Sequence, residues 1–145
     1  MVKLNVEINL ESDAKELFNL AIDFERTKDL FPAQLRNVRI ISKNNDEIIT
    51  KEELTFKTLL KDTVMEQKTV HKIHFPTIIS HITEGPFKKS VISAAFNKTE
   101  SGTNLIFNVE LIVPLKYKIL VPIIKSKYKA VLLSSAYKMN NLLVK

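Results

Sequence analysis

The sequence predicts an α+β protein in which a curved antiparallel sheet of about seven strands packs against one long C-terminal helix. Three observations lead to this fold class. Apolar and polar residues alternate strictly over Val2–Leu10, which is typical of a half-buried strand. Six further strand-like segments, separated by turn residues, follow between positions 35 and 113. Apolar residues then recur at spacings of three and four from Leu120 to Leu142, which predicts an amphipathic helix of about six turns.

The length and composition narrow the class of protein. A chain of 145 residues predicts a single domain spanning 1–145, and the 45% hydrophobic and 26% charged residues are ordinary for a soluble protein. The absence of cysteine excludes disulfides, thiolate metal sites and cysteine nucleophiles. Two glycines, Gly85 and Gly102, are too few for a glycine-rich phosphate loop. No apolar run approaches the roughly 20 residues of a membrane-spanning helix, and we therefore expect a cytoplasmic protein.

Two short helices are predicted after the first strand. Ser12 stands before Asp13 and a further acidic residue, a pattern that predicts a helix start with Ser12 as its cap. The apolar spacing that follows predicts that this helix ends near Asp23. A second short helix or turn is expected from Glu25 to Leu30, because the residue before a proline is forced out of the helical region.

The remaining strands are separated by clear turn signals. Asn44, Asn45 and Asp46 predict one tight turn, and Lys61 with Asp62 predicts the next. Gly102 suits the last turn, since glycine adopts positive φ without strain. The predicted strands cover residues 38–42, 47–60, 63–75, 77–83, 89–97 and 104–113, and the long helix runs from about Val121 to about Leu143.

A carboxylate is expected on the inward face of the sheet. Glu52 has the same strand parity as Ile48, Leu54 and Phe56, so it points to the same side as these apolar residues. A buried carboxylate must be paired or protonated, which favours a polar anchor for a ligand or a general base. The alternative is that Glu52 lies near an exposed strand end or beyond a bulge, as an ordinary surface residue.

A histidine is expected on the same face. His71 shares its parity with Met65, so it should point inward as a wall histidine with one hydrogen bond. His74 lies three residues on and points to the opposite face of the strand. The two imidazoles cannot ligate one metal ion without a bulge. We therefore predict no metal and no cofactor.

The positive charge is concentrated at the C-terminus. From Lys116 onward there are seven lysines and no acidic residue, out of a net charge of +6 for the whole chain. Lysines on a helix often only solvate its outer face, but such a segment also suits an anionic membrane surface, RNA or an acidic protein. The residues that would face a membrane or partner are Lys118, Lys125, Lys127 and Lys129.

The order of elements resembles the helix-grip fold of the START and birch-pollen-allergen superfamily, also called SRPBCC. Two segments carry the resemblance to its coenzyme Q-binding and polyketide cyclase-like branch. Residues 21–32 (AIDFERTKDLFP) are similar to that branch's run from an aspartate to an aromatic, a leucine and a proline. Residues 84–88 (EGPFK) are similar to its glycine-proline-phenylalanine-lysine turn. The resemblance implies a curved sheet wrapped around the long helix.

The resemblance also implies a non-enzymatic carrier of a hydrophobic small molecule, such as an isoprenoid quinone or another lipid. A sheet that grips a helix tends to leave a cavity between them, the usual place for such a ligand. One alternative is a polyketide cyclase- or aromatase-like enzyme that uses Glu52 and His71 as acid and base. Another is a regulator that binds RNA or the ribosome through the basic helix. The expected ligand-binding residues are Glu52, Leu54, Phe56, Met65, His71, Phe107, Val109, Tyr128 and Leu132.

Overall fold

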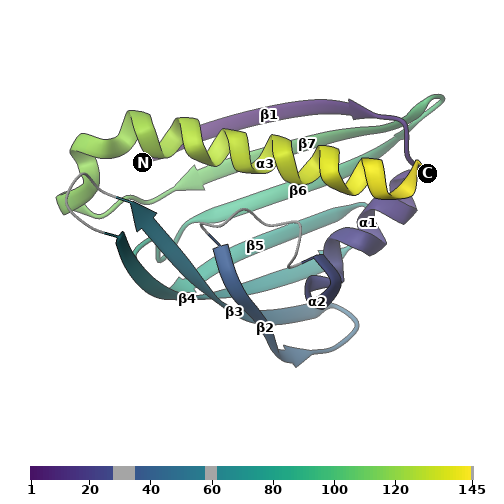
Figure 1. The fold of residues 1–145 in the computed structure, drawn as a ribbon. Coiled ribbons are helices and arrows are strands. Elements are labelled where there is room, and N and C mark those ends of the chain that lie inside the picture. The colour runs from purple at the N-terminus through teal and green to yellow at the C-terminus, as the bar shows by residue number, and fades with distance from the viewer. Residues whose placement is uncertain (28–34, 58–61, 145) are drawn as a thin grey trace.

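The computed structural model describes residues 1–27, 35–57 and 62–144 of the chain (Figure 1). Strand β1 comes first and is followed by two short helices, six further strands and the C-terminal helical segment. The fold class and the order of elements are as the sequence predicts. The elements are β1 (Val2–Leu10), α1 (Ala14–Ile22), α2 (Phe24–Thr27), β2 (Leu35–Lys43), β3 (Glu47–Lys57), β4 (Asp62–His74), β5 (Thr77–Glu84), β6 (Val91–Thr99), β7 (Gly102–Leu111), the 3₁₀ helix η2 (Leu115–Leu120) and α3 (Val121–Leu143).

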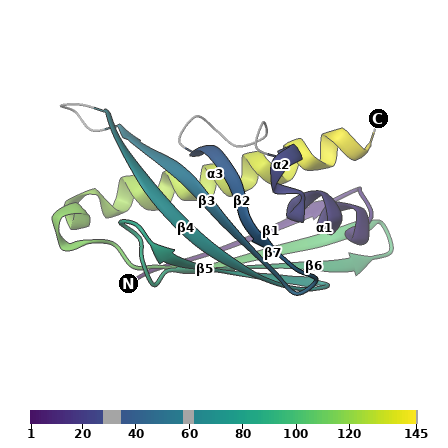
Figure 2. The same cartoon turned by 90° about the horizontal axis from the view of Figure 1, so that it is seen from below.

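The seven strands form one antiparallel sheet in the order β1-β7-β6-β5-β4-β3-β2. Consecutive strands from β2 to β7 are neighbours, so tight turns can join them. Strand β1 is an edge strand and pairs with β7. The two views in Figures 1 and 2 show the sheet curving around α3, with α1 and α2 on the same side as that helix. One face of the sheet is thereby covered.

The main core lies where β1, β7 and β6 meet α1 and α3. Alternate residues of the strands point into it, as the strict alternation of β1 predicts. Phe96 on β6 packs edge-to-face against Phe18 on α1, with ring centroids 5.7 Å apart. The other buried members are Val6, Ile8, Leu10, Ala14, Leu17, Leu20, Ile78, Ala94, Leu105, Phe107, Ala136 and Met139.

The start of α1 differs from the prediction. Asp13, not Ser12, is the N-cap, and its carboxylate accepts hydrogen bonds from the backbone N–H groups of Lys15 (3.0 Å) and Glu16 (3.2 Å). The buried Ser12 instead joins β1 to α3, because its hydroxyl donates to Asn140 Oδ1 at 2.8 Å. Both residues are good caps by type, and the tertiary contact to α3 decides between them.

The long helix has the predicted bounds and lies across the concave side of the sheet (Figure 1). Pro122 is in its first turn, where the missing N–H is tolerated. Its buried residues are Ile124, Ala136 and Met139. The predicted apolar stripe is wrong at its end, since Leu142 is exposed, whereas Ala136 completes the contact with the core.

Some predicted boundaries fall on residues that the structure does not describe. The expected end of the second helix at Leu30, the strand end at residue 60 and the turn at Lys61 lie outside the described residues. Where they can be compared, the strand boundaries agree within a few residues. Within the described part of the chain, no helix has the length and apolar character needed to cross a bilayer.

Candidate functional site

Two neighbouring strands place polar side chains on the inward face of the sheet, at positions where β1 and β7 place apolar ones. Thr50 and Glu52 on β3 and Gln67 and Thr69 on β4 are all buried. The strand register sets Glu52 opposite Gln67 and Thr50 opposite Thr69. The four side chains therefore point the same way and meet one another.

Glu52 is at the centre of this group. Its Oε1 accepts hydrogen bonds from Gln67 Nε2 at 2.9 Å and from the Thr69 hydroxyl, and its Oε2 accepts one from Thr50 Oγ1 at 2.8 Å. Burial raises the pKa of the Glu52 carboxyl, and the three donors oppose that shift. Its position among buried residues confirms the predicted inward orientation and excludes an exposed strand end.

His71 extends the group toward β5. Its Nε2 lies 2.9 Å from Thr50 Oγ1 and its Nδ1 lies 2.7 Å from Ser80 Oγ. Its ring stacks on Phe24 of α2 with centroids 4.3 Å apart. His71 makes two hydrogen bonds where one was predicted. Burial lowers the pKa of the imidazole to about 4, so the ring is neutral near pH 7.

The positions of the hydrogen atoms in these hydrogen bonds can be assigned by counting donors. The single hydroxyl hydrogen of Thr50 goes to Glu52. His71 Nε2 must then carry the hydrogen that it shares with Thr50, which leaves Nδ1 to accept from the Ser80 hydroxyl. A directed series of donors therefore runs from Ser80 through His71 and Thr50 to Glu52. We refer to Thr50, Glu52, Gln67, Thr69, His71 and Ser80 as the polar network.

One acceptor atom of the polar network receives no hydrogen bond from the described residues. Gln67 is only 8% exposed and uses its Nε2 to donate to Glu52, but its enclosed Oε1 has no hydrogen-bond partner in the part of the chain that the structure describes. An unsatisfied buried carbonyl oxygen costs about 1–3 kcal/mol. Gln67 was not among the predicted site residues, although its parity with Met65 and His71 was a usable signal.

Apolar side chains from β3, β7 and α3 lie together beside the polar network. Leu54, Val109, Tyr128 and Leu132, all predicted as ligand-binding residues, belong to one cluster of packed hydrophobic residues. Burial, and to a smaller degree the negative charge of Glu52, raises the pKa of the Tyr128 hydroxyl. Four predicted wall residues and the predicted anchor are thus brought together.

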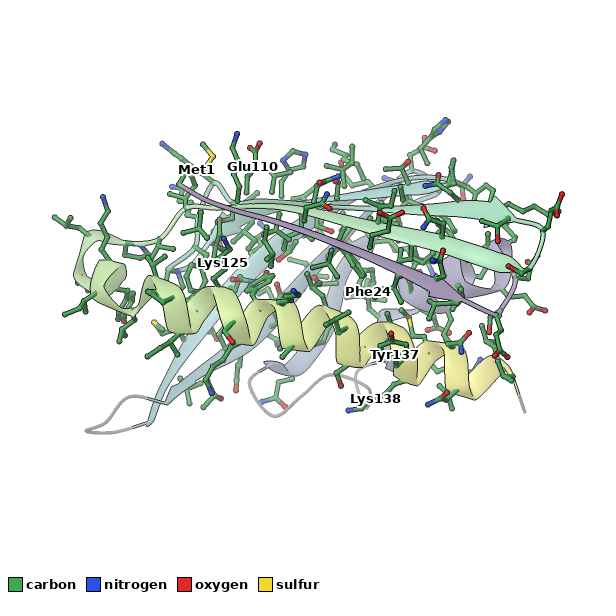
Figure 3. The ribbon with its side chains drawn as sticks, turned by 90° about the horizontal axis from the view of Figure 1, so that it is seen from above. Met1, Phe24, Glu110, Lys125, Tyr137 and Lys138 are labelled. Carbon is green, nitrogen blue, oxygen red and sulfur yellow. The ribbon has the colours of Figure 1, made fainter. Side chains whose placement is uncertain are left out.

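The other two predicted apolar wall residues with described side chains occupy the edges of this cluster. Met65 on β4 accepts a hydrogen bond through its sulfur from the Tyr117 hydroxyl, at 3.9 Å. Phe107 is buried in the neighbouring main core, which Leu132 also touches. The side chain of Phe56 lies outside the described residues. Figure 3 shows side chains from both layers between α3 and the sheet, Phe24 among them.

The arrangement of Glu52 and His71 bears on the acid–base hypothesis. Both groups reach a common point, but the Thr50 hydroxyl already occupies it. Each ring nitrogen of His71 has a partner as well. A substrate would have to break one of these bonds to meet either group, so the geometry favours positioning over proton transfer. Across the described ranges, no three His, Cys, Asp or Glu side chains are grouped as metal ligands.

The predicted partner-facing lysines are all on the surface. Lys118 is in η2, and Lys125, Lys127 and Lys129 are in the first turns of α3; each of the four is exposed. They lie apart from the polar network, which faces inward. Figure 3 shows Lys138 farther along the same helix.

The comparisons with known proteins find likeness in structure only. No family profile and no curated protein matches the sequence. The Zhui aromatase/cyclase from a Streptomyces species aligns over 99% of this chain and 96% of its own, with a TM-score of 0.84 and 8% identity. A protein from Thermus thermophilus aligns over 99% and 97%, with a TM-score of 0.77 and 13% identity.

The third solved structure is Ara h 8.0201, which covers 95% of this chain and 97% of its own, with a TM-score of 0.63 and 15% identity. All three agree with this chain over nearly its whole length, and the strand order and long gripping helix described above account for the agreement. The chain therefore has the helix-grip fold.

Proposed function

We propose that the protein binds a hydrophobic small molecule that carries one hydrogen-bond donor, between α3 and the inward face of β3, β4 and β7. Its apolar body would contact Leu54, Tyr128 and Leu132. Its polar group would lie against Glu52 and Gln67. A lipid or an isoprenoid quinol has this combination of a large apolar body and a single polar end.

The observation that carries the proposal is the unsatisfied Gln67 Oε1. The other side-chain polar atoms described for Glu52, Thr50, Thr69 and His71 are in hydrogen bonds. A ligand that donates to Gln67 Oε1 would remove the desolvation cost of that oxygen. Because the neighbouring side chains are apolar, that donor group would be attached to an apolar body.

The raised pKa of Glu52 adds a second requirement on the ligand. The burial that disfavours the charged form of the Glu52 carboxyl would equally disfavour a charged ligand group placed beside it. A hydroxyl, phenol or amide suits both Glu52 and Gln67 without bringing charge into the site. This supports a neutral polar end and argues against a free fatty acid.

A neutral fluorescent probe tests the proposal directly. N-phenylnaphthylamine has an apolar ring system and one N–H donor, and we expect its fluorescence to rise on binding. Gln67→Met keeps the side-chain length but removes the acceptor, and should weaken probe binding about tenfold, the value of one hydrogen bond to a buried group. Absence of any fluorescence increase with the unmodified protein, or equal binding by Gln67→Met, would contradict the proposal.

The matched control is Thr55→Val on β3, the strand that pairs with the strand of Gln67. The Thr55 Oγ1 is also buried and has no hydrogen-bond partner within the described ranges, but Thr55 has the opposite parity to Glu52 and belongs to the other face of β3. Its removal should leave probe binding unchanged. Mass spectrometry of lipids extracted from protein purified from its own cells would then identify the natural ligand, and a carboxylic acid as the retained species would refute the inferred neutral end.

A further inference from the structure

We propose that η2 and the first turn of α3 form a docking surface for an anionic lipid bilayer. This surface, the η2 patch, consists of Leu115, Ile119 and Ile123 with the surrounding Lys116, Lys118 and Lys125. It is separate from the polar network, and its argument does not depend on the proposed ligand.

The apolar part of the η2 patch is unusually exposed. Ile119 is 87% exposed and Leu115 81%, the two highest values among the large hydrophobic residues that the structure describes, and Ile123 is 55% exposed. Single exposed apolar side chains are ordinary on protein surfaces. Three of them within nine residues make a concentrated apolar surface that water solvates poorly.

The packing of the segment explains why these side chains point outward. Tyr117, Leu120 and Ile124 face the interior and pack in the cluster that contains Val109 and Leu132. The Tyr117 hydroxyl also donates to the Met65 sulfur, which holds η2 against β4. The fold thus fixes one side of the segment inward and leaves the other side, with the η2 patch, without contacts to the core.

The charge around the patch selects the partner. Lys116 and Lys118 alternate with the apolar residues of η2, Lys125 follows in α3 two residues after Ile123, and all three are exposed. Glu110 is the last acidic residue of the chain, and Figure 3 shows it on the face of the sheet away from α3. Among the described side chains, the structure gives no ion pair to Lys116, Lys118 or Lys125.

A bilayer surface fits both parts of the patch together. Protruding apolar side chains can enter the boundary between headgroups and acyl chains, while the ammonium groups remain at the lipid phosphates. RNA would match the lysines but offers no apolar layer for Leu115 and Ile119. Figure 1 shows the segment at one end of the molecule.

Vesicle co-sedimentation tests the η2 patch. We expect the protein to bind phosphatidylcholine vesicles that contain phosphatidylserine, not to bind pure phosphatidylcholine, and to be released by high salt. Each lysine near an anionic surface contributes a factor of roughly five, so Lys116→Gln combined with Lys118→Gln should weaken binding about 25-fold. Leu115→Ser combined with Ile119→Ser should weaken it by about tenfold or more.

The control removes the same charge at the other end of α3. Lys98 and Lys138 are exposed, and the β6–β7 turn and the end of α3 are joined through Ser12, which bonds both Thr103 and Asn140. Lys98→Gln combined with Lys138→Gln should retain vesicle binding within about twofold. Binding of N-phenylnaphthylamine should be the same in all three double variants, which separates this test from that of the proposed ligand.

Four results would overturn the docking surface. They are no binding to anionic vesicles at low salt, an equal loss in the Lys98/Lys138 control, no effect of the Leu115/Ile119 substitutions, and lysine-dependent RNA binding without vesicle binding. The last result would assign the same lysines to a nucleic acid. Retained unfolding transitions in each variant would show that the loss is not a loss of fold.

Discussion

Inward-facing and outward-facing residues alternate in both halves of the sheet, but the inward-facing residues are apolar in one half and polar in the other. In β1, β6 and β7 the inward positions are apolar and close-packed against α1 and α3. In β3 and β4 the equivalent positions carry Thr50, Glu52, Gln67 and Thr69, which are equally buried but bond mainly to one another. The inward side chains of the apolar half are buried by packing, whereas the polar half contains an acceptor, Gln67 Oε1, to which none of the described residues donates a hydrogen bond.

The difference shows that stability does not explain the polar half. Burial of apolar surface contributes about 25 cal/mol per Å², whereas burial of polar groups costs free energy unless every one is bonded. A Leu or Val at each of these positions would suit the fold better. We therefore regard the apolar half as the part that holds the fold together and the polar half as the part shaped for binding.

The largest effect is expected in the apolar half. Phe96 is 1% exposed and packs against Phe18, so Phe96→Ala should lower the free energy of unfolding by about 3–5 kcal/mol. Urea denaturation followed by circular dichroism measures this. A loss below about 1 kcal/mol would mean that this side of the sheet is not the main core.

The polar half should respond to acid. The unfolded His71 titrates near pH 6.5, but its pKa in the fold is about 4, so the unfolded state takes up the proton first as the pH falls. The contribution of His71 is therefore complete above pH 6.5 and is lost between about pH 6.5 and 4, by at most about 3 kcal/mol.

Two variants isolate that contribution. His71→Gln should remove this part of the pH dependence of the free energy of unfolding. His74→Gln, on the same strand but exposed, should keep it. Parallel pH profiles of the unmodified protein and His71→Gln would show that His71 is not shielded from protons in the fold.

A smaller effect is expected at the start of α1, again in the apolar half. Asp13→Ala removes the carboxylate that accepts from Lys15 and Glu16, and should cost about 1 kcal/mol. Thermal unfolding gives the value. Glu11→Ala, two residues earlier and exposed, serves as the control with the same loss of charge and should change stability by less than about 0.5 kcal/mol.

The smallest effect on stability belongs to Glu52. Because its pKa in the fold is raised, the unfolded carboxyl ionises first as the pH rises, and the contribution of Glu52 to stability falls toward neutral pH. Glu52→Gln should therefore change the free energy of unfolding at pH 7 by less than about 1 kcal/mol, while it alters binding of N-phenylnaphthylamine. A large loss of stability with unchanged binding would reverse the roles given to the two halves.

The fold was predictable because its signals are local and repeated. The alternation over Val2–Leu10 predicts only a strand, and the spacing from Leu120 predicts only a helix. Parity within a strand was enough to predict that the side chains of Glu52 and His71 point inward. Ser12 and Asp13 were misassigned because both are good caps, and only the contact with Asn140 separates them.

The polar network was less predictable, because it depends on how strands pair. The sequence of β3 or β4 alone does not predict that Glu52 is opposite Gln67, because a shift of two residues in the pairing register of the strands would bring another pair together. Ser80 becomes a partner of His71 only through the next pairing, of β4 with β5. The exposure of Leu115 and Ile119 likewise could not be predicted from the sequence, because it depends on which side of η2 packs against the core.

The one-way order of hydrogens from Ser80 to Glu52 makes the histidine a reporter. If Glu52 acquires a proton on Oε2, that oxygen becomes a donor to Thr50, whose own hydrogen must turn to His71 Nε2. The proton of His71 then moves to Nδ1 and is offered to Ser80. The ring exchanges one neutral tautomer for the other without gaining charge. Nitrogen NMR distinguishes the two tautomers, so a change in the protonation of Glu52 can be followed at His71, two hydrogen bonds away.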